Sequence, residues 1–435
     1  MDARAIIDTG RMGRRQVAAV ALCVFLNGLD GFDVLSISFA SPGIAREWGI
    51  DRAALGIVLS IELIGMALGS VLLGALADRI GRRPTILGCL AVMAAGMALA
   101  GTAKAVAPLA GFRLLTGIGI GGMLATINAV VAEVASARRR DLAVALMSSG
   151  YPLGAVLGGL VASALLVAHD WRTVFLFGAA VTALCVPLAA WLLPESIAFL
   201  AGSGRPGALV RINRTLRAFG HPAAVALRPA ATQRSVATAA LWTRDLAPVT
   251  ALLLAGYFAH IMTFYFVVKW VPKVVADMGF APSSAGGVLV WTNVGGAAGA
   301  LLFSLLIARV DVRRLTVTAL LLSTLAIALF GRSGADLGEL SLLAALAGFC
   351  SNAAIIGFYA LLPRSFPAAL RAGGTGFVIG IGRGGAALGP IVAGFLFATG
   401  WSLPGVAAGM ATGSLVAAAA LALLGRVVPS RKEPT

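Results

Sequence analysis

The stretch VAAVALCVFLNGLDGFDVLSISFA, residues 17–40, is apolar and long enough to cross a membrane as one helix, because a span needs about 20 mostly apolar residues. It nevertheless contains two acids, Asp30 and Asp33, whose spacing places both on one face of that helix. A charge near the bilayer centre costs at least ~2.5–3.5 kcal/mol, so such acids usually face a cavity and bind protons or cations. The alternative is that they only bond this helix to its neighbours.

The composition of the whole chain agrees with a membrane protein. Of 435 residues, 59% are hydrophobic and only 12% charged, whereas soluble domains have about 25% charged residues. The four cysteines are scattered through apolar segments, so neither a disulfide framework nor a metal site is expected. No nucleophile–base set is apparent, which argues against an enzyme and leaves no catalytic residues to name.

Apolar segments of spanning length recur along the chain. Twelve are predicted, at residues 17–40, 53–76, 84–103, 106–131, 142–167, 172–193, 247–270, 284–308, 314–331, 339–362, 372–399 and 403–425. We therefore expect an all-α membrane protein with three parts: a six-helix bundle in residues 1–193, a cytoplasmic linker in 194–246 and a second six-helix bundle in 247–435.

The basic residues predict the orientation. When the loops are assigned alternately to the two sides, 25 of the 34 Lys and Arg residues fall on one side, together with both termini. That side is the cytoplasm by the positive-inside rule. Lys269 and Lys273 fall at the outer end of the seventh span, where interfacial anchoring is the expected role and attraction of anions is the alternative. The net charge of +16 therefore reflects topology and contact with anionic membrane lipid, and nucleic acid is not an expected partner.

The linker contains RPGALVRINRTLRAF, residues 205–219. Leu209, Ile212, Leu216 and Phe219 recur at helical spacing, and arginines lie off that stripe. This pattern predicts an amphipathic helix on the cytoplasmic surface; a solvated linker is the open alternative.

Two pairs of similar segments indicate an internal repeat. Asp78 and Asp311 each follow the second span of their half, and LGGLVASALL (157–166) resembles LGPIVAGFLF (388–397). The interval along the chain is nearly the same for both pairs. Duplication of a six-span unit is typical of transporters that bind substrate between two halves near the middle of the membrane.

The string GALADRIGRR, residues 74–83, resembles the loop signature between spans 2 and 3 of the major facilitator superfamily. The resemblance implies that superfamily's fold and a cytoplasmic latch made by Gly74, Asp78, Arg79, Gly81 and Arg82. The second-half copy, IARVDVRR (307–314), keeps Asp311 but lacks the glycines. A generic positive-inside loop is the alternative.

The segment FRLLTGIGIGG, residues 112–122, resembles the superfamily's span 4 motif, whose arginine is linked to proton coupling. Arg113 would remain charged in the membrane and needs an anion or many acceptors. Its expected partner is a carboxylate of Asp30, Asp33 or Glu62, and the alternative is bonding to backbone carbonyls.

Together with DGFD in span 1, the segments LPES (193–196) and GFVIGIGRGGAALGPIVAG (376–394) resemble the aromatic acid/proton symporter family. That resemblance implies uptake of benzoate-type carboxylates with protons, and it assigns the family's span 1 aspartates to Asp30 and Asp33 and its span 11 arginine to Arg383. Glu62 departs from the family pattern. It could be a second protonatable site, a contact to a hydroxylated substrate or half of an internal salt bridge.

Arg383 is the expected anchor for the substrate carboxylate, since a guanidinium binds a carboxylate bidentately; an ion pair with Glu62 or an aspartate is the alternative. Tyr257, His260 and Phe264 share one face of span 7 and could stack on a flat ring, although a lone histidine in a span more often bonds two helices. Further candidates for the cavity are Trp291, Asn293, Asn352 and Tyr359.

The sequence thus predicts a monomeric, proton-coupled importer of a small aromatic carboxylate in a bacterial inner membrane, with protons as coupling ion, no other cofactor and no metal. Asp30, Asp33, Glu62 and Arg113 would couple protons. The rivals are an antiporter that exports amphipathic compounds, a symporter of a non-aromatic organic acid and a receptor that uses the transporter fold.

Overall fold

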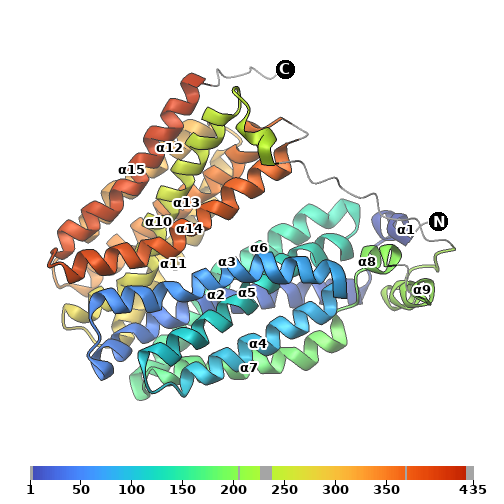
Figure 1. Ribbon diagram of the computed structural model, residues 1–435, viewed down its shortest axis with the longest axis horizontal. Helices are drawn as coiled ribbons and strands as arrows, with labels where there is room; N and C mark the ends of the chain where they lie inside the picture. Colours follow the sequence, from blue (N-terminus) through green and yellow to red (C-terminus); the bar gives the residue numbers. More distant parts are fainter. Residues whose placement is uncertain (1–2, 204–205, 226–237, 368–369, 428–435) are drawn as a thin grey trace. The chain divides into compact units, whose positions relative to one another are not determined.

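The computed structural model describes residues 3–203, 206–225, 238–367 and 370–427, and all the regular structure in these ranges is helical (Figure 1). Its elements are α1 (Ala3–Thr9), α2 (Arg14–Trp48), α3 (Arg52–Ile80), α4 (Arg82–Gly101), α5 (Val106–Val134), η1 (Ala137–Arg139), α6 (Arg140–Ala168), α7 (Arg172–Leu192), α8 (Ile197–Gly202), α9 (Ala208–Phe219), η2 (Thr238–Trp242), α10 (Ala247–Asp277), α11 (Pro282–Leu306), α12 (Val312–Phe330), α13 (Leu337–Ser365), α14 (Arg371–Ala398) and α15 (Leu403–Val427). Some basic residues counted for topology lie outside the described residues: Arg205, Arg228, Arg234, Arg431 and Lys432.

Twelve of these helices are long and apolar enough to cross a membrane, so the predicted number and order of spans are confirmed. The helices extend beyond the predicted spans: the first runs over Arg14–Trp48, whereas the apolar segment covers 17–40. An apolar window marks only the part that suits hydrocarbon, while helical hydrogen bonding continues into the polar flanks.

The chain forms two compact units. Unit 1 comprises Met1–Val34, Ile64–Gly158 and Arg172–Gln233, and unit 2 comprises Leu35–Leu63, Gly159–Trp171 and Arg234–Thr435. The boundaries fall within α2, α3 and α6, so each of these helices contributes to both units. Unit 2 therefore contains one end of α2, α3 and α6 together with all the helices of the second half.

Glycines bring equivalent helix pairs into close contact in the two units. In unit 1, a Cβ added at Gly154 of α6 would overlap the carbonyl oxygen of Gly28 in α2. In unit 2, a Cβ at Gly385 of α14 would overlap the carbonyl oxygen of Phe258 in α10. The interval from Gly154 to Gly385 is almost the same as that from Gly28 to Phe258, so the repeat places the same packing device in both halves.

A second helix pair repeats in the same way. A Cβ at Gly69 of α3 would overlap the Ile118 carbonyl oxygen in α5, and a Cβ at Gly299 of α11 would overlap the Phe349 carbonyl oxygen in α13. The interval from Gly69 to Gly299 is close to the one that separates the repeated sequence motifs. The duplication is therefore visible in the packing as well as in the motifs.

The amphipathic helix of the linker is present as α9. Ile212, Leu216 and Phe219 of its apolar stripe are buried, while the arginines at 211, 214 and 217 are exposed. The helix starts at Ala208 because Gly207 at its N-cap has a left-handed backbone, with φ of 75°. Helices α1, α8 and α9 lie together at the end of unit 1 where α4 begins (Figure 1).

Candidate functional site

Arg383 lies near Tyr257, one of two contacting tyrosines in unit 2. Tyr257 of α10 is buried and its ring covers Gly382 of α14, the residue before Arg383. The hydroxyl oxygens of Tyr257 and Tyr359 are 3.3 Å apart, and the charge of Arg383 is close enough to act on Tyr257. Arg383 is half-buried and makes no hydrogen bond or ion pair with a described residue. The predicted ion pair with Glu62 or an aspartate is thus not formed within the described part of the chain, and the guanidinium is available to an anion.

His260 is part of a buried polar network that joins four helices. Its Nε2 donates to the Ser351 carbonyl oxygen at 2.9 Å, so its Nδ1, 2.9 Å from the Ser414 hydroxyl, accepts in the neutral ring. Ser323 lies 2.8 Å from the Ser351 hydroxyl and completes the network across α10, α12, α13 and α15. His260 is fully buried, which supports the helix-to-helix interpretation.

Four further candidates make contacts of other kinds. The Asn293 amide donates to Leu289 in its own helix, and Asn352 packs against Gly296 of α11. The ring centres of Phe264 and Tyr265 are 5.4 Å apart, and the two rings are nearly perpendicular. Trp291 is 54% exposed. No hydrogen bond or ring contact within the described ranges joins these four to the tyrosine pair.

The acids of α2 are buried in unit 1. Asp30 and Asp33 are 1% and 0% exposed, and the Asp33 carboxylate faces Gly178 of α7. Arg113 of α5 is fully buried; its Nη2 donates to the main-chain oxygen of Asp33 at 2.8 Å, and its guanidinium lies 5.2 Å from the Phe175 ring centre. Arg113 and Asp33 are therefore neighbours, with a backbone carbonyl as one acceptor.

Glu62 pairs with a lysine in unit 2. The Lys269 ammonium is 3.8 Å from the Glu62 carboxylate, and both side chains are fully buried. The interpretation of Lys269 as an interfacial anchor is therefore wrong. Helix α10 continues to Asp277, two turns beyond Lys269, so this residue lies inside the helix bundle. At the end of the same helix, Asp277 forms an exposed ion pair with Arg52 at 3.1 Å.

The loop between α3 and α4 is held by acids from elsewhere in unit 1. Arg82 pairs with Glu133 of α5 at 2.7 Å, and the Glu195 carboxylate accepts the main-chain N–H of Arg82 at 2.8 Å. Gly81 has a φ of 113°, and a Cβ there would lie 2.5 Å from Glu195 Oε2. Gly81 is thus required for both its backbone and its lack of a side chain.

The other latch candidates have simpler surroundings. Asp78 and Arg79 are exposed, and a Cβ added at Gly74 would lie 3.9 Å from the Ala125 methyl group. Asp311 caps α12 by accepting the Arg314 main-chain N–H at 2.9 Å. Any residue that is favoured at an N-cap can accept this hydrogen bond, so the contact does not by itself indicate a latch.

Sequence reasoning missed Glu133 and Glu195 as the partners of this loop. LPES was noted only as a family feature, and Glu133 was not singled out. Both are far from the loop along the chain, so the available signal was that each acid follows an apolar segment and precedes several arginines.

The family profile described as Major Facilitator Superfamily matches residues 20–289 and 252–435. The chain is 31% identical to a gallate transporter of Pseudomonas putida, over 93% of this chain and 90% of the relative. It is 30% identical to a 4-hydroxybenzoate transporter of the same species, over 98% and 95%, and 31% identical to a 3-(3-hydroxy-phenyl)propionate transporter of Escherichia coli, over 94% of each.

Solved structures agree on the fold. A bacterial homologue of the human lysosomal transporter Spinster has a TM-score of 0.74 at 16% identity, covering 96% of this chain and 99% of its own. The xylose transporter of E. coli has a TM-score of 0.69 at 17% identity, covering 97% and 99%. With twelve apolar helices, a matching profile and full-length relatives, the chain belongs to the major facilitator superfamily, as a multi-pass, non-enzymatic membrane transporter that resembles aromatic acid transporters of that superfamily.

Proposed function

We propose that the protein imports a small aromatic carboxylate of the hydroxybenzoate type together with protons, by alternating access. The observation that carries this proposal is Arg383, a guanidinium without a hydrogen bond or ion pair to a described residue, near Tyr257, whose hydroxyl lies 3.3 Å from that of Tyr359. A carboxylate binds such a guanidinium through two hydrogen bonds, and tyrosine rings contact a flat ring. The relatives named for gallate, 4-hydroxybenzoate and 3-(3-hydroxy-phenyl)propionate support this substrate class.

In this proposal Asp30 and Asp33 receive the proton. The charge of buried Arg113 balances an ionised acid beside it, and protonation of Asp33 changes the charge of this group of residues inside the membrane. A proton that moves with a carboxylate anion cancels the anion's charge, so the loaded transporter gains no net charge to carry through hydrocarbon.

In the proposed cycle, the buried ion pair of Glu62 and Lys269 is a second group of charges, in addition to Asp33 and Arg113. Glu62 lies on α3, in the first set of six spans, and Lys269 lies on α10, in the second set. Alternating access requires the two sets to separate at one side of the membrane and then at the other. This pair therefore forms in one state of the cycle and parts in another, and a proton on Glu62 would ease its separation.

The proposed placement is a bacterial inner membrane with both termini in the cytoplasm. The two bundles, residues 1–193 and 247–435, act as the halves of a monomer, and residues 194–246 join them. The loop at 74–83 and Asp311 contribute to a cytoplasmic latch, for which the exposed Asp78 and Arg79 are suited.

The test is uptake of labelled 4-hydroxybenzoate into proteoliposomes with and without an inward proton gradient. We expect accumulation that is lost when the gradient is collapsed. Arg383→Gln should raise KM about 10- to 100-fold, because a charged hydrogen-bonded contact contributes about 1.5–3 kcal/mol. Arg332→Gln, an exposed arginine outside the spans, is the matched control and should leave KM unchanged.

Two results would contradict the proposal. Uptake at the same rate with and without the proton gradient would show that transport is not coupled to protons. Failure to transport or bind any benzoate, with efflux of amphipathic cations or uptake of non-aromatic acids instead, would replace the substrate class while leaving the fold unaffected.

A further inference from the structure

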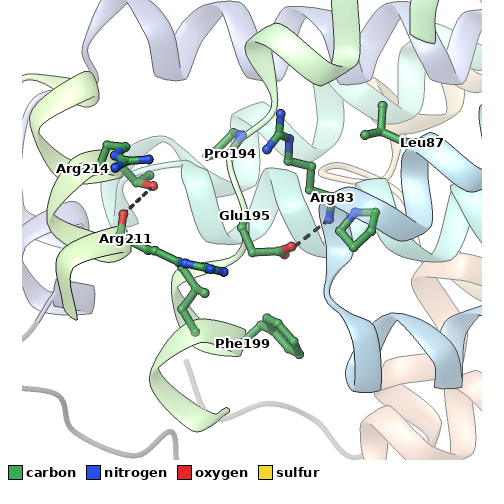
Figure 2. A pocket seen from close by; sticks show the side chains of 10 residues that line it. Arg83, Leu87, Pro194, Glu195, Phe199, Arg211 and Arg214 are labelled. Carbon is green, nitrogen blue, oxygen red and sulfur yellow. Dashed lines mark hydrogen bonds between the residues drawn. The ribbon is translucent and has the colours of Figure 1, made fainter. Parts of the chain in front are cut away.

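A pocket of about 440 Å³ lies at the end of unit 1 where α4 begins and α7 ends (Figure 2). Its walls come from the first residues of α4, the segment after α7, α8 and α9. Figure 2 shows the side chains of Arg83, Arg211 and Arg214 around Glu195. None of these four residues belongs to the transport site proposed above, so the pocket needs its own explanation.

The pocket has an excess of positive charge. The Glu195 carboxylate already accepts main-chain N–H groups from Arg82 at 2.8 Å, Ser196 at 2.9 Å and Arg83 at 3.3 Å. Arg211 and Arg214 are exposed and form no ion pair with a described residue. Arg83 donates through Nη2 to the Ala190 carbonyl oxygen, while its buried Nε has no hydrogen-bond partner among the described residues. The exposed guanidinium groups of Arg211 and Arg214 are therefore available to an anion.

The neighbouring surface of α7 places this pocket at the edge of the membrane. Leu184, Leu188 and Trp191 are 72%, 39% and 76% exposed and share one face by their spacing. An exposed apolar stripe on a spanning helix faces lipid, and tryptophan is enriched where hydrocarbon meets the headgroups. Trp191 directly follows Ala190, the residue that Arg83 contacts, so the arginines lie at headgroup depth.

The pocket also has an apolar wall. Leu87, one turn into α4, and Phe199 of α8 line it together with the arginines. A soluble phosphate needs no such wall, whereas a phospholipid presents an anionic headgroup and an acyl chain side by side. Arginine binds phosphate oxygens bidentately, and basic pockets on the cytoplasmic side of membrane proteins bind anionic headgroups.

We propose that this pocket binds the headgroup of an anionic phospholipid such as phosphatidylglycerol, with Arg83, Arg211 and Arg214 on the phosphate and Leu87 beside the start of an acyl chain. A bound lipid would join α9 of the linker to the loop between α3 and α4. The linker helix would then be a lipid-dependent part of the transporter.

The test uses the purified full-length protein titrated with short-chain phosphatidylglycerol, with bound lipid counted by native mass spectrometry. Each arginine removed should weaken binding about fivefold, so the double variant Arg211→Gln/Arg214→Gln should bind about 25-fold more weakly. Arg217→Gln is the matched control: it lies on the same helix and is exposed, but it does not line the pocket. The unfolding temperature without lipid should be the same for all variants.

Several outcomes would overturn the proposal. Equal losses in the Arg217 variant and the double variant would mean that only diffuse surface charge attracts the lipid. Equal affinity for phosphatidylcholine would remove the requirement for an anionic headgroup. Binding of glycerol 3-phosphate or inorganic phosphate as tight as that of the lipid would assign the pocket to a soluble phosphate instead. No measurable binding of phosphatidylglycerol would refute the site itself.

Discussion

The Lys269 ammonium lies 3.8 Å from the Glu62 carboxylate, and both side chains are fully buried in unit 2. Each charge loses several kcal/mol of hydration on burial, and attraction to the other offsets this loss only while both are present. The pair joins α3 to α10, one helix from each half of the repeat. A state that separates these helices must therefore neutralise the two groups or expose them to water.

Replacing one member of this pair should lower the stability of the folded protein more than replacing both. Lys269→Met removes the ammonium beside the buried Glu62 carboxylate and should lower the free energy of unfolding by about 3–5 kcal/mol. The double variant Glu62→Gln/Lys269→Met should recover most of that loss, because neither charge of this pair remains. Thermal unfolding in detergent measures both.

Lys273 provides the control for this comparison. It pairs with Asp277 one turn further along α10, where the Asp277 side chain is 33% exposed. Lys273→Met should cost only about 0–1 kcal/mol, as expected for an ion pair in contact with water. A double variant as unstable as Lys269→Met would show that the two charges do not stabilise each other.

Asp33→Asn should abolish gradient-driven accumulation of substrate while leaving exchange of labelled for unlabelled substrate intact. The asparagine keeps the size of the side chain beside Gly178 but cannot take up or release a proton. Counterflow in proteoliposomes without a gradient measures the exchange, and it also shows that the variant is folded. Accumulation that survives in Asp33→Asn would assign coupling to other residues.

The parts of the structure that the sequence predicts are those that local patterns determine. The twelve apolar segments of spanning length correspond to twelve helices. The near-constant interval between repeated motifs also separates Gly28 from Phe258 and Gly154 from Gly385. The stripe of the linker likewise predicts which face of α9 is buried. Periodicity and length are properties of a single segment, so no knowledge of the partner helix is needed.

The parts that were missed depend on residues far apart in the chain. Lys269 looked like an anchor because the apolar segment ends at 270, yet Glu62, in the other half of the repeat, pairs with it inside the bundle. The Glu195 carboxylate accepts the main-chain N–H of Arg82, and four α-helices separate the two residues along the chain. Such pairings depend on how helices pack, and one sequence contains no record of which distant residues meet.

His260 offers a test between a structural role and proton transfer. His260→Phe keeps a flat ring but leaves the Ser351 carbonyl and the Ser414 hydroxyl without this partner, at a cost of about 1–3 kcal/mol. We expect a lower unfolding temperature and an unchanged pH profile of uptake. Ser414→Ala, which removes a single bond to the imidazole, should have a smaller effect on stability. A shifted pH profile at unchanged stability would instead indicate that His260 carries a proton.

His221, just after α9, predicts a pH effect outside the membrane. Burial lowers the pKa of this imidazole below its usual value near 6.5, because the charged form is desolvated where the ring packs on Gly10. Its Nε2 lies 3.1 Å from Gln16 Oε1. The unfolded segment therefore binds the proton more tightly than the folded one. The stability that His221 contributes is complete above pH 6.5 and is lost as the pH falls through the lower folded value.

Hydrogen exchange of residues 206–225 should accordingly be faster at about pH 5.5 than at about pH 7.5, after correction for the intrinsic effect of pH. His221→Gln, which keeps a donor for Gln16 but does not titrate in this range, should remove the difference. His169, which is exposed and directly follows α6, is the control position, and His169→Gln should leave the difference in place. If the pH effect persists in His221→Gln, the arginines of α9 or the acids near α1 are responsible for it, and the docking of this segment does not depend on the imidazole.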